Sequence, residues 1–206
     1  MATEIETTHE TRSRHSEGRS GGSLLGEGGT GMVIGAAAVG LAAGLAANLG
    51  RKAVVQGMSA ATGDWATALA GEHAALLKVF DQLQATSESD ERKRSTLLAT
   101  MKHALMKHAV QEENTVYPAL RDAGEVAGAD ELNHEHGYVK QYLYELENMP
   151  KNSPEFLPTV ARFRADIEDH MREEENDLYP RLHAKLSEAE NRKLTLAMNK
   201  EGFKVA

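Results

Sequence analysis

The 206-residue chain contains no cysteine. This absence excludes disulfides, cysteine-ligated zinc, iron–sulfur clusters and thiol nucleophiles. It is typical of a protein kept in a reducing compartment, and we expect a cytoplasmic location. Any bound metal must then be held by imidazole and carboxylate groups, which suit iron, manganese and zinc. Nine histidines and 31 acidic residues are present to supply such ligands.

Basic residues and aromatic residues are also scarce. Lysine and arginine number 23, which leaves a formal charge of −8, and all of that excess falls after residue 63. Because phosphate binding requires clustered basic side chains, we expect no nucleic-acid partner. Aromatic residues make up 5% of the chain, so the hydrophobic core is expected to consist mainly of aliphatic residues and methionine.

Composition divides the N-terminal third into two segments. Residues 1–31 are polar and rich in glycine, serine, threonine and glutamate, which predicts disorder. Residues 32–63 form a Gly/Ala-rich apolar segment and linker, in which residues 32–49 carry no charge. That run is near the minimum length for a membrane span and contains Gly-x-x-x-Gly spacings. We interpret it as a packing or self-association helix, with weak membrane association as the less favoured alternative.

From Asp64 onward, apolar residues recur at spacings of three and four, which predicts helices. Residues 64–186 are expected to form four of them, and residues 187–206 a short C-terminal helix and tail. The expected spans are Asp64, as N-cap, to about Thr86; about Asp90 to Gly124; about Ala129 to Met149; and a fourth helix opening at Ser153-Pro154. A capping-box pattern at Ser187 and Glu190 opens the fifth helix, which should end near Lys200.

The second half of this region repeats the first. His108 and His170 each begin the pattern His-x-x-x-Glu-Glu-Asn-x-(Val/Leu)-Tyr-Pro-x-Leu, at an offset of 62 residues. The dipeptide Glu72-His73 recurs as Glu135-His136 at an offset of 63 residues, followed each time by matching apolar positions. A duplicated helical hairpin predicts an all-α, up-down four-helix bundle.

The repeat places one histidine in each apolar stripe and a glutamate one turn after two of them. These six candidate metal ligands are His73, His108, Glu112, His136, His170 and Glu174. Because a buried carboxylate without a partner is costly, we expect cations among them: two ions bridged by the carboxylates, with two imidazoles each. Open coordination positions would face a dry pocket lined by Leu76, Leu105, Val139 and Ile167. The alternative is a solvated helix face with ordinary i, i+4 pairs.

Other histidines fit the pattern less well. His134 competes with His136 for the position on the third helix, but His136 alone reproduces the spacing that follows His73. His103 has alanine at its repeat position and is expected at the surface. The remaining histidines, His9, His15 and His183, lie outside the stripes and are expected to be exposed.

Polar residues beside the six candidates have two interpretations each. Glu113, Glu175 and Asp169 are one step off the ligand face. We interpret them as solvated charges, the alternative being acceptors for ligand imidazoles. The two Tyr-Pro pairs, which begin at Tyr117 and Tyr179, are interpreted as kinks at helix ends, the alternative being tyrosines that reach the metals.

In this order of ligands, the sequence resembles the hemerythrin-like (His-His-Glu cation-binding) domain family over residues 64–185. The resemblance implies two non-haem iron ions as the cofactor, with manganese and zinc as alternatives. Oxygen-carrying hemerythrins have a further histidine where this chain has Lys140, and an aspartate in the role of Glu174. The chain is therefore more similar to bacterial hemerythrin-like proteins, which are implicated in oxygen, nitric oxide or peroxide chemistry, iron sensing, or stress response.

Three hypotheses for function follow. The first is a di-iron protein that binds or reacts with a diatomic or peroxide ligand, with catalytic turnover left open. The second is an iron-responsive interaction module, in which occupancy of the site folds the bundle and a partner recognises the folded state. The third is a metal-free structural helical protein. We favour the first.

Overall fold

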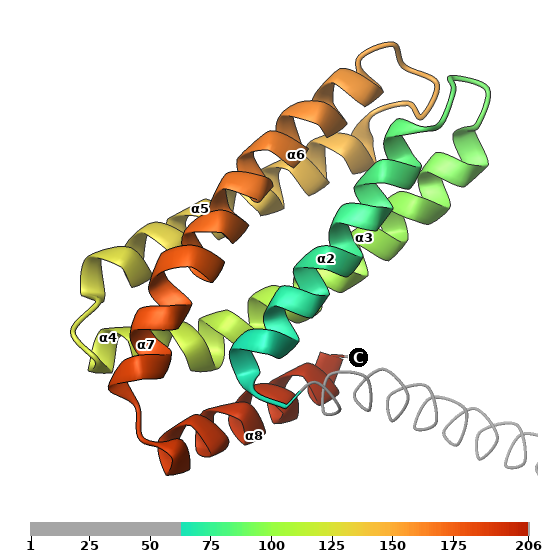
Figure 1. Ribbon diagram of the computed structural model, residues 1–206. Coiled ribbons are helices and arrows are strands. Elements are labelled where there is room, and N and C mark those ends of the chain that lie inside the picture. Colours follow the sequence, from blue (N-terminus) through green and yellow to red (C-terminus); the bar gives the residue numbers. More distant parts are fainter. Residues whose placement is uncertain (1–62, 206) are drawn as a thin grey trace, which may run out of the picture. The chain divides into compact units, whose positions relative to one another are not determined.

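The computed structural model describes residues 63–205, and these residues form five helices with no strand among them (Figure 1). This confirms the all-α fold class. The segments 1–31 and 32–49 lie outside the described residues. Between residues 63 and 205, no helix combines the length and apolar character needed to cross a membrane.

Three of the five helices are uninterrupted: α2 spans Trp65–Gln84, α5 spans Val126–Asn148 and α8 spans Glu188–Val205. The other two each contain a π-helical turn between two α-helical pieces. The second helix consists of α3 (Glu91–Gln111), the π-turn η1 (Glu112–Val116) and α4 (Tyr117–Asp122). The fourth helix repeats this order with α6 (Phe156–Glu173), η2 (Glu174–Leu178) and α7 (Tyr179–Lys185).

Local chemistry sets most helix ends where the sequence predicts them. The carboxylate of Asp64 accepts the backbone N–H of Thr67, so it caps α2. Gly124 ends the second helix in the left-handed region, with φ = +89°. The Glu190 carboxylate accepts the Ser187 N–H while the Ser187 hydroxyl accepts the Glu190 N–H, which confirms the capping box.

Three ends differ from the prediction. Helix α5 begins at Val126 rather than near Ala129, because the Ala129 N–H already donates to the Glu125 carbonyl. Helix α6 begins at Phe156 rather than at Pro154, because a turn closed by the Ser153 carbonyl and the Phe156 N–H comes first. Helix α8 continues to Val205 rather than ending near Lys200, because Met198 and Gly202 are buried on its inner face. Packing against the bundle thus sustains a helix that sequence alone predicts to be short.

The helices pack as two hairpins, α2 with α3 and α5 with α6, and each hairpin lies against the other through α2–α6 and α3–α5 (Figure 1). This is the predicted bundle of duplicated hairpins. Helix α8 crosses one end and contacts α2, α3 and η1. The indole N–H of Trp65 donates to the side-chain oxygen of Asn191 at 2.8 Å, which holds α8 to the start of α2.

The interior contains two apolar clusters separated by a polar layer. One cluster includes Leu69, Val116, Leu132 and Leu178, and the other includes Leu76, Leu105, Leu143 and Ile167. Each of the four candidate histidines falls in the sequence between a residue of one cluster and a residue of the other. The bundle therefore places all four imidazoles at one level along its axis.

Candidate metal centre

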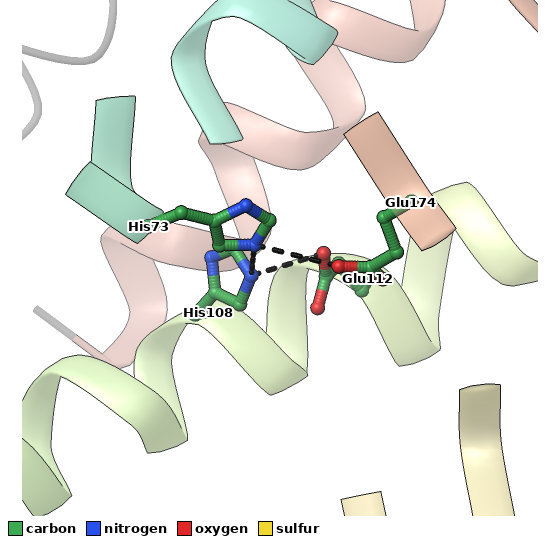
Figure 2. A group of neighbouring side chains, drawn as sticks. All are labelled: His73, His108, Glu112 and Glu174. Carbon is green, nitrogen blue, oxygen red and sulfur yellow. Dashed lines mark hydrogen bonds and ion pairs between the residues drawn. The ribbon is translucent and has the colours of Figure 1, made fainter. Parts of the chain in front are cut away.

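The six residues singled out from the sequence all lie in this polar layer. The four histidines are 2–6% exposed, and both glutamates are fully buried. His73 comes from α2 and His108 from α3, while Glu112 and Glu174 open the π-turns η1 and η2. Figure 2 shows these four side chains turned toward one another.

The first half of the centre joins His73 and His108 to both glutamates. The Nε2 atoms of the two imidazoles lie 2.7 Å apart. The Nε2 atom of His108 is 3.0 Å from Oε1 of Glu112, and that of His73 is 3.4 Å from Oε2 of Glu174 (Figure 2). A single position therefore faces two imidazole nitrogens and two carboxylates.

The second half repeats this arrangement with His136 and His170. The Nε2 atom of His136 lies 3.4 Å from Oε2 of Glu112, and that of His170 lies 3.4 Å from Oε2 of Glu174. Each glutamate thus faces one histidine of its own helix and one from another helix. The two carboxylates lie between the two pairs of imidazoles.

Four outer glutamates fix the orientation of the imidazoles through their Nδ1–H groups. The acceptors, at 2.7–3.3 Å, are Glu175 for His73, Glu72 for His108, Glu113 for His136 and Glu135 for His170. Each outer contact in one half has its repeat equivalent in the other. With Nδ1 engaged outward, all four Nε2 atoms point inward, which is the usual arrangement of histidines that bind metals.

Two phenols complete the inner layer. Tyr117 donates its hydroxyl hydrogen to Oε1 of Glu174 at 2.8 Å, and Tyr179 donates to Oε1 of Glu112. Both tyrosines directly follow a π-turn, in which the N–H of Tyr117 reaches back five residues to the carbonyl of Glu112. Such turns are frequent at functional sites because the extra residue redirects the side chains around them.

Without a cation, the two buried carboxylates are electrostatically unequal. Burial raises the pKa of Glu112, but the charges and hydrogen bonds of His108 and His136 together outweigh burial and hold that pKa well below its usual value. Burial and the adjacent charge of Glu112 raise the pKa of Glu174 to about 7. Burial acts to lower the pKa of His136, yet hydrogen bonds to Glu112 and Glu113 raise it to about 9.

Three buried atoms of the centre have no hydrogen-bond partner: Oε2 of Glu112, Oε2 of Glu174 and Nε2 of His170. Buried polar atoms are rarely left without partners, so this convergence needs an explanation. Two groups of side chains place their ligand atoms close enough to hold one ion each. They are His73, His108, Glu112 and Glu174 in the first, and Glu112, His136 and His170 in the second. Imidazole nitrogens and carboxylate oxygens fit divalent iron, manganese or zinc.

A model of the hemerythrin HHE cation-binding domain matches residues 66–182, which is more than half of the chain. The chain belongs to this hemerythrin family. Membership implies the binding of metal cations, typically iron, and agrees with the His/Glu groups found in the bundle.

The chain spans less than half the length of the relatives that it matches. An uncharacterized hemerythrin-like protein of Schizosaccharomyces pombe is 35% identical over 92 residues, which is 42% of this chain and 44% of that protein. A protein of Nostoc sp. named DNA nickase is 28% identical over 109 residues, which is 53% of this chain and 30% of that protein. No solved structure matches the chain.

Several residues around the hemerythrin centre differ from the roles that we favoured from the sequence. Glu113 and Glu175 accept imidazole N–H groups, so interpreting them as solvated charges was wrong; Asp169 is exposed and pairs with Arg172. The two tyrosines reach the inner carboxylates instead of serving only as kinks. Glu72 and Glu135 were not among the residues predicted from the sequence, although their repetition beside His73 and His136 was a usable signal.

The other histidines lie away from the centre. His134 is exposed, and its Nε2 is 3.1 Å from the hydroxyl of Tyr138. His103 and His183 are also exposed, as expected, while His9 and His15 fall outside the described residues. Of the expected pocket residues, Leu105, Val139 and Ile167 line a cavity of about 10 Å³ beside His108, His136 and His170, whereas Leu76 does not.

Proposed function

We propose that this hemerythrin domain holds two iron ions and binds or reacts with a small ligand: oxygen, nitric oxide or a peroxide. The observation that supports the proposal is the inward convergence of four imidazole Nε2 atoms on two buried carboxylates. His73 and His108 would hold one ion, His136 and His170 the other, and Glu112 and Glu174 would bridge them. Iron, when bound, supplies reversible one-electron chemistry and open coordination positions.

The side chains around these ligands define what the site can accept. The outer glutamates keep each imidazole in the tautomer that leaves Nε2 free for a metal. Tyr117 and Tyr179 hold hydroxyl protons at Oε1 of Glu174 and Glu112, which fixes the carboxylate orientation and places two proton donors beside the centre. Burial raises the pKa of both phenols well above the usual value, so they stay protonated at neutral pH.

The small cavity beside His108, His136 and His170 favours ligands of a few atoms. Its volume of about 10 Å³ corresponds to about one water-sized probe, and its walls include Leu105, Ala109, Val139 and Ile167. An apolar entrance of this size favours a diatomic molecule or a peroxide over larger substrates. It also keeps bulk water from the centre, which strengthens the electrostatic interactions there.

The direct test is the metal content and spectrum of the full-length protein from iron-supplemented cells. Elemental analysis should find two irons per chain, and the absorption spectrum should change on addition of oxygen, nitric oxide or peroxide. A His73→Ala/His136→Ala variant should lose iron, whereas the matched His103→Ala/His183→Ala variant, which changes two exposed histidines, should keep it. Wild-type protein without stoichiometric metal would overturn the proposal.

A second candidate function is that of an iron-responsive interaction module. It is supported by Glu112 and Glu174, because burial and the mutual repulsion of the two carboxylates raise the pKa of Glu174 to about 7. A cation would relieve this repulsion, so metal occupancy would stabilise the bundle. The nicking activity in the name of the Nostoc protein is not proposed for this chain, because its formal charge of −8 disfavours nucleic acid.

A further inference from the structure

A solvent-facing groove of about 790 Å³ lies between α5 and α6, outside the metal centre. His170 is common to both: its imidazole lines the groove, and its Nε2 faces the inner carboxylates. Glu135, which accepts the Nδ1–H of His170 at 2.7 Å, also lines the groove. His170, a candidate ligand, and Glu135, its outer glutamate, therefore separate the groove from the metal centre.

The groove is lined mainly by acidic residues, whereas the equivalent positions in the first half of the repeat are not. Five carboxylates and one arginine line it: Glu131, Glu135, Glu145, Asp166, Asp169 and Arg162. The matching positions between α2 and α3, taken at the repeat offsets, contain one carboxylate and two lysines: Glu72, Lys78 and Lys107. Since the helices are duplicated, simple packing does not require this difference in charge.

The contrast is sharpest beside the outer glutamates. In the first half, Lys107 is buried and its ammonium group lies 2.5 Å from Oε1 of Glu72, the outer partner of His108. The repeat equivalent of Lys107 is Asp169, which is exposed, lines the groove and pairs with Arg172. The positively charged Lys107 therefore lies on the outer side of His108, whereas the equivalent position outside His170 is the negatively charged Asp169.

Ligand atoms of the centre lie directly behind the wall that His170 and Glu135 form. His170 is 5% exposed, and its Nε2 is one of the buried atoms without a hydrogen-bond partner. The neighbouring Oε2 of Glu174, 3.4 Å away, also has no hydrogen-bond partner. An ion that passes His170 would reach both of these ligand atoms at once.

We propose that the groove between α5 and α6 is the entry route for the divalent cation, and that its carboxylates steer the ion to the His136/His170 half of the centre. The inference rests on the proposed function, since it presupposes that the centre takes up metal. Clefts lined by one sign of charge raise the local concentration of the opposite ion and increase association rates by tenfold or more. The side sealed by Lys107 would then receive its ion through the centre.

The test measures how fast metal-free, full-length protein takes up Fe²⁺ under anaerobic conditions. Samples are quenched at intervals with excess ferrous chelator, and the amount of protein-bound iron per chain is measured. A Glu131→Gln/Glu145→Gln/Asp169→Asn variant removes three groove charges without altering any candidate ligand or its outer glutamate. At low ionic strength it should load about three- to tenfold more slowly than wild type and reach the same final iron content.

Two controls separate steering from other effects. A Glu88→Gln/Glu155→Gln/Glu188→Gln variant loses the same net charge at exposed positions that do not line the groove, and it should load at the wild-type rate. The single variant Asp169→Lys, which copies the first repeat, should slow loading on its own. The differences should shrink at about 0.5 M salt, because screening shortens the range of the groove charges.

Equal rates for wild type and the groove variant would overturn the route. Equal slowing in both triple variants would also overturn it, since net charge would then explain the effect. A groove variant with a lower final iron content would mean that its carboxylates help to hold the ion, which again contradicts steering. Wild-type protein that retains no iron at all would instead refute the proposed function, and the two failures are therefore distinguishable.

Discussion

At the scale of single residues, the centre is built from two layers of carboxylates with different tasks. Glu112 is fully buried and faces His108 and His136 from within, while its sequence neighbour Glu113 contacts His136 from outside. An inner carboxylate would supply charge and an oxygen ligand to the metals. An outer one sets the tautomer and orientation of a ligand. Two adjacent residues can therefore be used to separate the two tasks.

We expect Glu112→Gln to abolish stoichiometric iron binding, because it removes the negative charge shared by both candidate ion positions. Glu113→Gln should keep the iron but weaken its affinity by about 10- to 100-fold, as is typical for loss of an outer partner. Elemental analysis and competition with a chelator of known affinity measure both effects, and circular dichroism checks that each variant folds. A Glu112→Gln protein with the iron content of wild type would contradict this assignment of the bridge.

The raised pKa values of histidines in the same layer predict how the free energy of unfolding of the metal-free protein depends on pH. The native pKa of His136 is about 9, and those of His108 and His170 are also raised above the usual 6.5. Between pH 6.5 and 9, the folded protein thus holds more protons than the unfolded chain, so its stability must fall as pH rises. Each fully shifted histidine contributes up to about 1.4 kcal/mol per pH unit.

Urea unfolding of metal-free protein at pH 6.5, 7.5 and 8.5 should therefore show a decreasing free energy of unfolding. Iron-loaded protein should lose this trend or reverse it, because metal ligation needs deprotonated imidazoles and strengthens as protons leave. Stability of the metal-free form that increases over this range would show that the buried histidines are neutral there.

The inner residues could be predicted from sequence, whereas the pairing of each outer glutamate with its histidine could not. His73, His108, His136 and His170 continue apolar stripes, and duplication shows that none of them is accidental. The outer pairs join different helices, and His73 and Glu175 are 102 residues apart in the chain. Spacing along one helix carries no information about such a contact. It can be found only once the packing of the helices is known.

At the scale of elements, the helices themselves follow from apolar periodicity, but the two π-turns do not. Each turn inserts one residue into the hydrogen-bonding pattern. The spacing of apolar residues within each flanking α-helical segment stays the same, so this spacing does not reveal the insertion. The consequence is large, because η1 places both Glu112 and Tyr117 in the polar layer, and η2 does the same for Glu174 and Tyr179. The Pro that follows each tyrosine lacks an N–H group, which suits this irregular stretch.

Helix α8 provides an element-scale prediction through Asn191. Its side-chain oxygen accepts the indole N–H of Trp65, and its amide group donates to backbone carbonyls, including that of His183 at 3.1 Å. Asn191→Ala would leave the buried indole N–H without an acceptor, so we expect a loss of about 1–3 kcal/mol in the free energy of unfolding. Trp65 is the chain's single tryptophan, and its fluorescence should report the change directly.

The matched control is Asn148→Ala, at an exposed residue whose amide donates to the Tyr144 carbonyl. It should change the free energy of unfolding by less than about 0.5 kcal/mol. Equal effects of the two substitutions would mean that α8 is not held to the bundle through Asn191.

At the scale of the whole molecule, the centre joins all four helices of the bundle. Each hairpin contributes two histidines and one inner glutamate, so both candidate ion positions need both hairpins. Removing the metal leaves Glu112 and Glu174 facing each other in a layer that excludes water. Cation binding to the folded state alone must then stabilise the entire bundle by linkage.

We therefore expect chelated protein to melt at a lower temperature than iron-loaded protein. With free metal at about 1,000 times its dissociation constant, linkage predicts about 4 kcal/mol of additional stability. Circular dichroism melts with and without Fe²⁺ measure the difference, and the His73→Ala/His136→Ala variant should show none. If the metal-free chain keeps its helices at 25 °C, the bundle is preformed and a binding or reactive centre is favoured. Loss of most helix without metal would favour the iron-responsive module, in which occupancy controls the fold that a partner recognises.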